Sequence, residues 1–211
     1  MTIAKIASGI PLLENGDRLH RVEFERRYEA SPHIRKAELI EGIVYVASPV
    51  RFTVHAEPHS NLIGWLWTYK TAMGDLDLGI EPTLRLDNEN EPQPDGVLFR
   101  IDGNARIDED GYIVGTPELV VEISASTASY DLHDKKRAYW RNGIKEYIVW
   151  RTLDAQIDWF VLEEGRYVLM QPDTDGIFRS RQFTGLWLNG PAMLAGDMAA
   201  VLKTLHDGLK I

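Results

Sequence analysis

The sequence predicts a single α/β domain in which a mixed β-sheet is flanked by helices. Three observations carry this prediction. Short apolar runs with strand-like alternation recur along the chain, most clearly at 119–123. Apolar side chains at helical spacing cover 58–73. The length of 211 residues fits one domain with a sizeable core.

The N-terminal part is expected to hold an arm, a helix and a hairpin. Residues 1–19 are predicted as a loosely attached arm, and 20–211 as the domain. A short charged helix covers 21–28. Residues 37–46 predict two strands around a tight turn, because Gly42 supplies the backbone freedom that the turn needs.

The remaining elements alternate between helices and strands. A helix is expected over 58–73, with Pro58 suited to its first position, and a polar loop over 102–115. Gly143 ends a helix over 131–142, and Asp197 caps the last helix. A short helix is expected to open at 189–191, and the predicted strands are 79–86, 93–101, 119–123, 145–150, 156–162 and 166–170, the last two joined as a hairpin.

Composition narrows the classes of function. The chain has no cysteine, which excludes disulfides and thiolate metal sites. It has no apolar run of about 20 residues and no signal-like N-terminus, so we expect a cytoplasmic protein without a membrane segment. A net charge of −9, with only local basic clusters, argues against broad affinity for nucleic acid.

Two carboxylates in apolar surroundings indicate a metal site. Glu122 interrupts the apolar run 119–123, where alternation puts it on the same strand face as Val120. A lone ionised carboxylate there would cost several kcal/mol unless it is paired or binds a cation. Asp95, at the start of another predicted strand, would supply a second oxygen ligand, and such a pair suits Mg²⁺ or Mn²⁺. A turn at Asp95 and an arginine partner for Glu122 are the structural alternatives.

These residues resemble a known family when they are taken in order. The chain is similar to the Uma-type restriction endonucleases, a branch of the nuclease superfamily named for a Pro-Asp … Asp/Glu-x-Lys core. The resemblance implies a restriction-endonuclease-like fold and runs from about residue 38 to 147. It rests on the following pieces: Pro94-Asp95, Val120-Val121-Glu122-Ile123-Ser124, Asp131-x-x-x-Lys135-x-x-x-Tyr139, and Gly143-Ile144-x-Glu146-Tyr147.

The resemblance also implies roles for individual residues. Asp95 and Glu122 would hold the metal, with Glu38 as a third carboxylate acting through a water. Ser124 stands where the superfamily has its lysine, so Lys135, on the following helix, is the implied catalytic cation. The alternative is a surface ion pair between Lys135 and Asp131, four residues apart on a helix, which would add little stability.

Further residues are expected around this site or away from it. His59 and Tyr139 are candidate substrate contacts. The run His55-Ala56-Glu57-Pro58-His59 resembles a zinc-protease helix but is not expected to be one, because the glutamate is displaced and Pro58 should break the helix that joins the two histidines. The aromatic-rich helix around Trp65 and Trp67 indicates a homodimer.

The predicted function is metal-dependent hydrolysis of phosphodiester bonds in nucleic acid, with DNA favoured over RNA. A metal-bound water would attack in line while Lys135 positions it. Two alternatives stay open: an inactive dimeric binding module of the same fold, and a hydrolase of another phosphorylated molecule. Ser124 and the net charge of −9 favour them.

Overall fold

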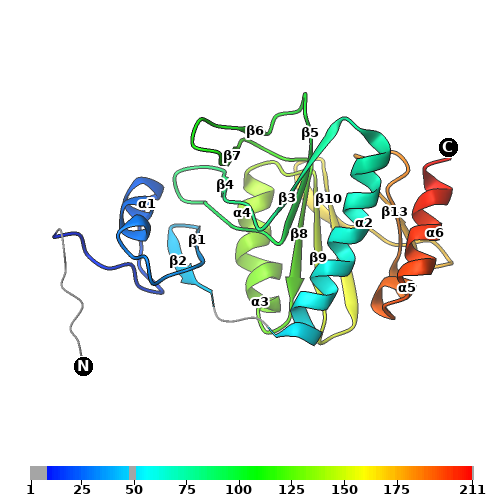
Figure 1. Ribbon diagram of the computed structural model, residues 1–211, viewed down its shortest axis with the longest axis horizontal. Helices are drawn as coiled ribbons and strands as arrows, with labels where there is room; N and C mark the ends of the chain where they lie inside the picture. Colours follow the sequence, from blue (N-terminus) through cyan, green and yellow to red (C-terminus); the bar gives the residue numbers. More distant parts are fainter. Residues whose placement is uncertain (1–8, 48–50, 211) are drawn as a thin grey trace.

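A six-stranded sheet forms the centre of the structure (Figure 1), a computed structural model that describes residues 9–47 and 51–210. The strand order is β11-β10-β9-β8-β5-β3. Strands β8 and β9 run parallel, and the other neighbours run antiparallel, which confirms the predicted mixed sheet. The strands are β3 (Leu76–Ile80), β5 (Gly96–Arg100), β8 (Leu119–Ser124), β9 (Glu146–Arg151), β10 (Gln156–Glu163) and β11 (Arg166–Leu169).

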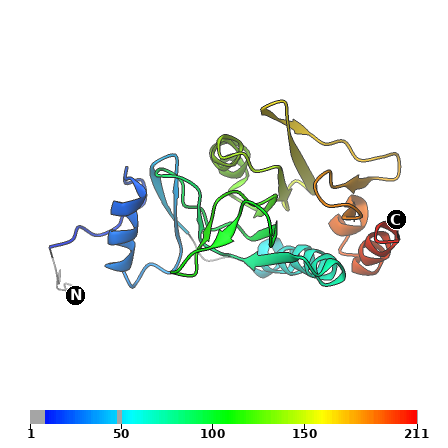
Figure 2. The same ribbon diagram turned by 90° about the horizontal axis from the view of Figure 1, so that it is seen from above.

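Helices cover both faces of this sheet, so that the structure has three layers (Figure 2). One face packs against α2 (Glu57–Met73), α5 (Gly190–Leu194) and α6 (Met198–Gly208). The other face packs against a helical stretch made of α3 (Ala128–Tyr130), η2 (Asp131–Lys135) and α4 (Lys136–Arg141). Strand alternation divides β8 between these faces as predicted. Val121 lies in the core under α2, and Val120 lies in the core under α4.

The N-terminal elements, α1 (Arg21–Glu29), β1 (Ala37–Ile40) and β2 (Ile43–Val46), stand beside the sheet rather than in it (Figure 1). The β1–β2 turn has positive φ angles of 52° at Glu41 and 74° at Gly42, a conformation typical of two-residue hairpins. These elements form a separate hydrophobic cluster: Leu13, Phe24, Ala37, Leu39 and Val44. Leu39 pairs with Glu91 and so joins the cluster to the rest of the chain. The arm predicted over 1–19 lies partly outside the described residues, and its division from the domain stays a prediction.

Several strands differ from the prediction. The strand expected over 79–86 is interrupted at Glu81, which has a φ of 50°, and at Pro82. Its second part becomes β4 (Leu84–Arg85), and the loop predicted over 102–115 carries two short strands that join it in a three-stranded sheet, β6 (Arg106–Ile107) and β7 (Ile113–Val114). The pair β12 (Ile177–Arg179) and β13 (Trp187–Asn189) was not predicted.

The helix predicted to begin at Pro58 begins six residues earlier. A π-helical turn, η1 (Phe52–Ala56), leads directly into α2, and Pro58 lies in the first turn of α2. A proline is tolerated there because the first turn of an α-helix leaves its N–H groups without helical partners. None of the described helices combines the length and the hydropathy of a membrane span.

Candidate active site

The Glu122 side chain lies at the centre of the candidate site. It leaves β8 on the face covered by η2 and α4, and it is 4% exposed. Its Oε1 accepts hydrogen bonds from Lys135 Nζ at 2.8 Å and from Tyr139 OH at 2.8 Å. Among the described residues, none donates a hydrogen bond to Oε2, so this oxygen is available to a ligand.

Lys135 joins carboxylates from three parts of the fold. Its Nζ lies 2.8 Å from Glu122 Oε1, 2.9 Å from Glu38 Oε1 and 3.9 Å from Asp131 Oδ1. The lysine is 4% exposed, so the alternative of a surface ion pair with Asp131 is wrong. Burial disfavours the ammonium form, but these three carboxylates hold the pKa of Lys135 well above its usual value.

Glu38 reaches the site from the N-terminal hairpin. Besides the lysine, its Oε1 accepts the backbone N–H of Gln93 at 2.7 Å. Glu41, three residues further along the same hairpin, instead pairs with Arg141 at the surface, where Arg141 Nη1 lies 2.8 Å from Glu41 Oε2. The structure therefore brings Glu38, and not Glu41, to Lys135.

Asp131 belongs to the motif that carries the resemblance but was not predicted as a site residue. Its carboxylate accepts hydrogen bonds from the hydroxyl groups of Ser124 and of Thr127, the latter at 2.7 Å, and its backbone carbonyl accepts one from Tyr147. Ser124, in the superfamily's lysine position, thus orients Asp131 beside Lys135. The position of Ser124, two residues after Glu122, was the signal that the sequence offered. Its contact with Asp131 could not be predicted, because it depends on how β8 meets η2.

Asp95 lies at the start of β5, opposite Glu122. The register pairs Gly96 with Val121, and one further step puts Asp95 across from Glu122. Asp95 Oδ2 accepts the backbone N–H of Ile123 at 2.6 Å. Burial would raise the pKa of Asp95, but His55, this N–H and Lys36 together hold it below its usual value.

Gly96 allows α2 to pass close to this strand. A Cβ atom at Gly96 would lie 2.7 Å from a methyl group of Val121 and 3.0 Å from one of Ile63, on α2. The beginning of α2 and the residue before Gly96 are therefore held against each other. The two histidines at this end of the helix lie next to Asp95.

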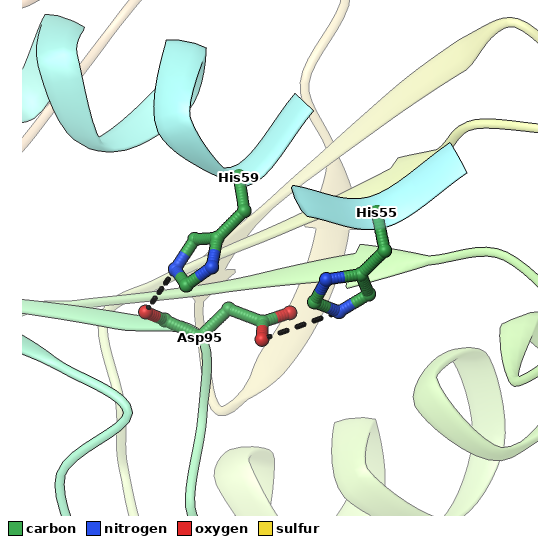
Figure 3. Close-up of side chains that lie close together, drawn as sticks. All are labelled: His55, His59 and Asp95. Atoms are coloured by element: carbon green, nitrogen blue, oxygen red, sulfur yellow. Dashed lines mark hydrogen bonds and ion pairs between the residues drawn. The ribbon is translucent and has the colours of Figure 1, made fainter. Parts of the chain in front are cut away.

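His55 and His59 both face Asp95 (Figure 3). His55 Nε2 lies 3.4 Å from Asp95 Oδ1, and His59 Nε2 lies 2.8 Å from the Asp95 backbone oxygen. One ligand atom from each of the three residues lies within 4.8 Å of the others. The expectation that Pro58 would separate the histidines is wrong, because the π-helical turn before Pro58 continues into α2 without a break.

Negative charge dominates the site. Three buried carboxylates, Glu38, Glu122 and Asp131, lie within 4 Å of the buried ammonium of Lys135, and a fourth, Asp95, lies across from Glu122. Burial raises the pKa of Glu122, and the other three carboxylates raise it further against the opposing effect of Lys135. Such a set of oxygens suits a divalent cation, which would relieve the repulsion among them.

Comparison with known proteins agrees with this geometry. Residues 21–190 match the model of the Uma2 family, described as "Putative restriction endonuclease". The chain belongs to the Uma2 family. A crystal structure described as a putative nuclease belonging to DUF820, from Anabaena variabilis, has a TM-score of 0.59 and 13% identity, and the match covers 75% of this chain and 89% of that chain. No curated protein matches the sequence significantly.

Uma2 membership confirms the resemblance seen in the motifs, and the likeness to the Anabaena structure confirms the restriction-endonuclease-like fold. The family's spaced motif residues Asp95, Glu122, Lys135 and Tyr139 meet around one site. The motifs that carry the resemblance did not assign His55 to the site. Its contact with Asp95 depends on the π-helical turn in which it lies.

Proposed function

We propose that this Uma2 protein is a metal-dependent nuclease that hydrolyses phosphodiester bonds. The observation that carries the proposal is the placement of Asp95 across from Glu122, whose Oε2 accepts no hydrogen bond from the described residues. Both carboxylates would hold Mg²⁺ or Mn²⁺, which, when bound, lowers the pKa of a water and polarises the phosphate. This assigns to the pair the role that the sequence predicted.

Lys135 would act as a fixed positive charge at the reacting phosphate. Its hydrogen bond to Glu122 and its ion pair with Glu38 hold the ammonium in place before substrate arrives, and preorganised charge of this kind stabilises the transition state. Glu38 positions the lysine and would support the metal through a water.

Tyr139 is fully buried, and its hydroxyl group donates to Glu122. We therefore assign it to the orientation of Glu122 rather than to the predicted contact with substrate. His59 likewise serves first to hold Asp95 through the backbone carbonyl.

Substrate would approach from the side of Lys36 and His55. The side chains of Lys36 and His55 are 28% and 16% exposed, whereas those of Asp95 and Glu122 are 5% and 6% exposed. Burial disfavours the charged form of Lys36, but the nearby carboxylates of Asp95, Glu38 and Glu122 keep the pKa of Lys36 above its usual value. The ammonium of Lys36, which lies 3.1 Å from Glu81 Oε1, is thus placed to meet a phosphate at the rim of the site.

The substrate, the assembly and the location are also part of the proposal. We favour DNA over RNA, a homodimer and a cytoplasmic setting, as the sequence indicated. Trp65 is fully buried in the core, but Trp67, on the same helix, is 56% exposed and offers an apolar contact for a second copy.

Cleavage of labelled oligonucleotides tests the proposal. Single- and double-stranded DNA and RNA are incubated with Mg²⁺ or Mn²⁺, and we expect cleavage that falls by at least about a hundredfold in Asp95→Ala and in Glu122→Ala. Asp207→Ala, at an exposed carboxylate on α6, is the matched control and should keep wild-type activity. Cleavage unchanged in both site variants would refute the assignment.

An inactive binding module of the same fold is the second candidate. The observation that favours it is the complete use of Lys135 in buried ion pairs, together with Ser124 in the superfamily's lysine position. Wild-type protein that binds Mn²⁺ but cleaves none of the four substrates would support this candidate over the nuclease.

A further inference from the structure

Two histidines on one helical face meet the carboxylate of Asp95. His55 lies in η1 and His59 in the first turn of α2, four residues apart, so both rings point to the same side of a continuous helix (Figure 3). The sequence had predicted that Pro58 would break the helix between these two histidines.

The spacing of these groups fits a metal better than a hydrogen bond. A charge-assisted N–H···O contact is about 2.7–2.9 Å long, whereas His55 Nε2 and Asp95 Oδ1 are 3.4 Å apart. Two ligands of a tetrahedral ion, each at about 2.0–2.1 Å from it, lie about 3.4 Å from each other. One ligand atom from each of the three residues already lies within 4.8 Å of the other two.

Neighbouring groups orient the ligands toward this point. His59 Nε2 must donate its proton to the Asp95 carbonyl, because a carbonyl oxygen only accepts, and this leaves the ring's lone pair on Nδ1. Asp95 Oδ2 is occupied by the N–H of Ile123, which leaves Oδ1 facing His55. Hydrogen bonds from the far side of each ligand are the usual support of a metal site.

We propose that His55, His59 and Asp95 bind one first-row transition-metal ion of the Zn²⁺, Co²⁺ or Mn²⁺ type in preference to Mg²⁺. Imidazole nitrogen suits these ions, whereas Mg²⁺ prefers an all-oxygen shell and keeps its waters. This site shares Asp95 with the Asp95–Glu122 pair of the proposed nuclease and in that sense rests on it, but binding is measurable without substrate.

Calorimetry with Zn²⁺ and Mn²⁺ on the full chain tests the site. His55→Ala and His59→Ala should each weaken binding by about tenfold or more, and excess Mg²⁺ should not displace Zn²⁺ from wild type. His206→Ala, an exposed histidine on α6, is the matched control and should bind as wild type does. Unchanged Zn²⁺ and Mn²⁺ affinity in both site variants would overturn the proposal.

A measurement on unmodified protein guards against variants that fail to fold. With ¹⁵N-labelled histidine, Zn²⁺ should shift the ring-nitrogen resonances of two of the six histidines. If none shifts, the proposal fails, even where Mg²⁺-dependent cleavage persists and the nuclease proposal stands. If two shift but no nucleic acid is cleaved, the metal site stands and the nuclease proposal fails.

Discussion

Replacing Lys135 by methionine should destabilise the metal-free protein and increase the stabilisation that a metal provides. The change removes a buried ammonium that lies within 3 Å of both Glu38 and Glu122. Loss of one partner from a buried ion pair costs about 3–5 kcal/mol. We expect the low end, about 3 kcal/mol, because Glu122 can take up a proton when its partner is lost.

The amount by which Mn²⁺ raises the free energy of unfolding can also be calculated. Mn²⁺ at about 100 times the wild-type Kd stabilises wild type by about 2.7 kcal/mol. Without the competing ammonium, the cation should bind about tenfold more tightly, so the same concentration would stabilise Lys135→Met by about 4.1 kcal/mol.

Urea unfolding followed by tryptophan fluorescence, with and without Mn²⁺, measures both quantities. Lys203→Met, at a side chain that is 79% exposed on α6, is the control and should change the free energy of unfolding by less than about 0.5 kcal/mol. The reasoning is refuted if Lys135→Met is as stable as Lys203→Met without metal, or if Mn²⁺ stabilises wild type and Lys135→Met equally.

Activity, pH and assembly provide three more checks. Lys135→Ala should lower the rate of single-turnover cleavage by roughly a hundredfold. Lys135→Arg should restore little of that rate, because a planar guanidinium does not replace a compact ammonium. If Lys135→Ala cleaves at the wild-type rate, the lysine has no part in the mechanism. Burial and Glu25 raise the pKa of Glu91 from 4.5 to about 8, so its contribution to stability is present below pH 4.5 and is lost as pH rises through about 8. Urea unfolding between pH 5 and 9 should show this loss in wild type and not in Glu91→Gln, and equal pH profiles would contradict the assignment. Light scattering at micromolar concentration should give twice the 24.0 kDa chain mass for wild type and the chain mass for Trp67→Glu, whereas a wild-type monomer would rule out the dimer.

The sequence was most informative where one residue conflicts with its surroundings. Glu122 interrupts an apolar strand, and the energetic penalty for such a carboxylate correctly indicated charged partners within the fold. Helical spacing likewise grouped Asp131, Lys135 and Tyr139 on one face. The identity of the lysine's partners could not be read this way, because Glu38 comes from a hairpin nearly a hundred residues earlier in the chain.

The histidine pair shows why local rules failed at one point. Proline in a helix interior was expected to separate His55 from His59, and the rule assumed regular α-helical turns on both sides. A π-helical turn closes its hydrogen bonds over five residues rather than four. That turn places Pro58 where no N–H is missed, and its formation depends on packing that periodicity does not report.

The separate hydrophobic cluster of the N-terminal elements affects the thermodynamics of the whole site. Glu38 belongs to β1, which packs with α1 and not with the central sheet, yet its carboxylate fixes the ammonium of Lys135. Partial opening of a small peripheral cluster requires less free energy than global unfolding. Loss of the β1 contacts would therefore leave the sheet folded while it releases one of the two closest carboxylates from Lys135. Amide hydrogen exchange in β1 thus reports how often the charge arrangement around Lys135 is incomplete in the otherwise native protein.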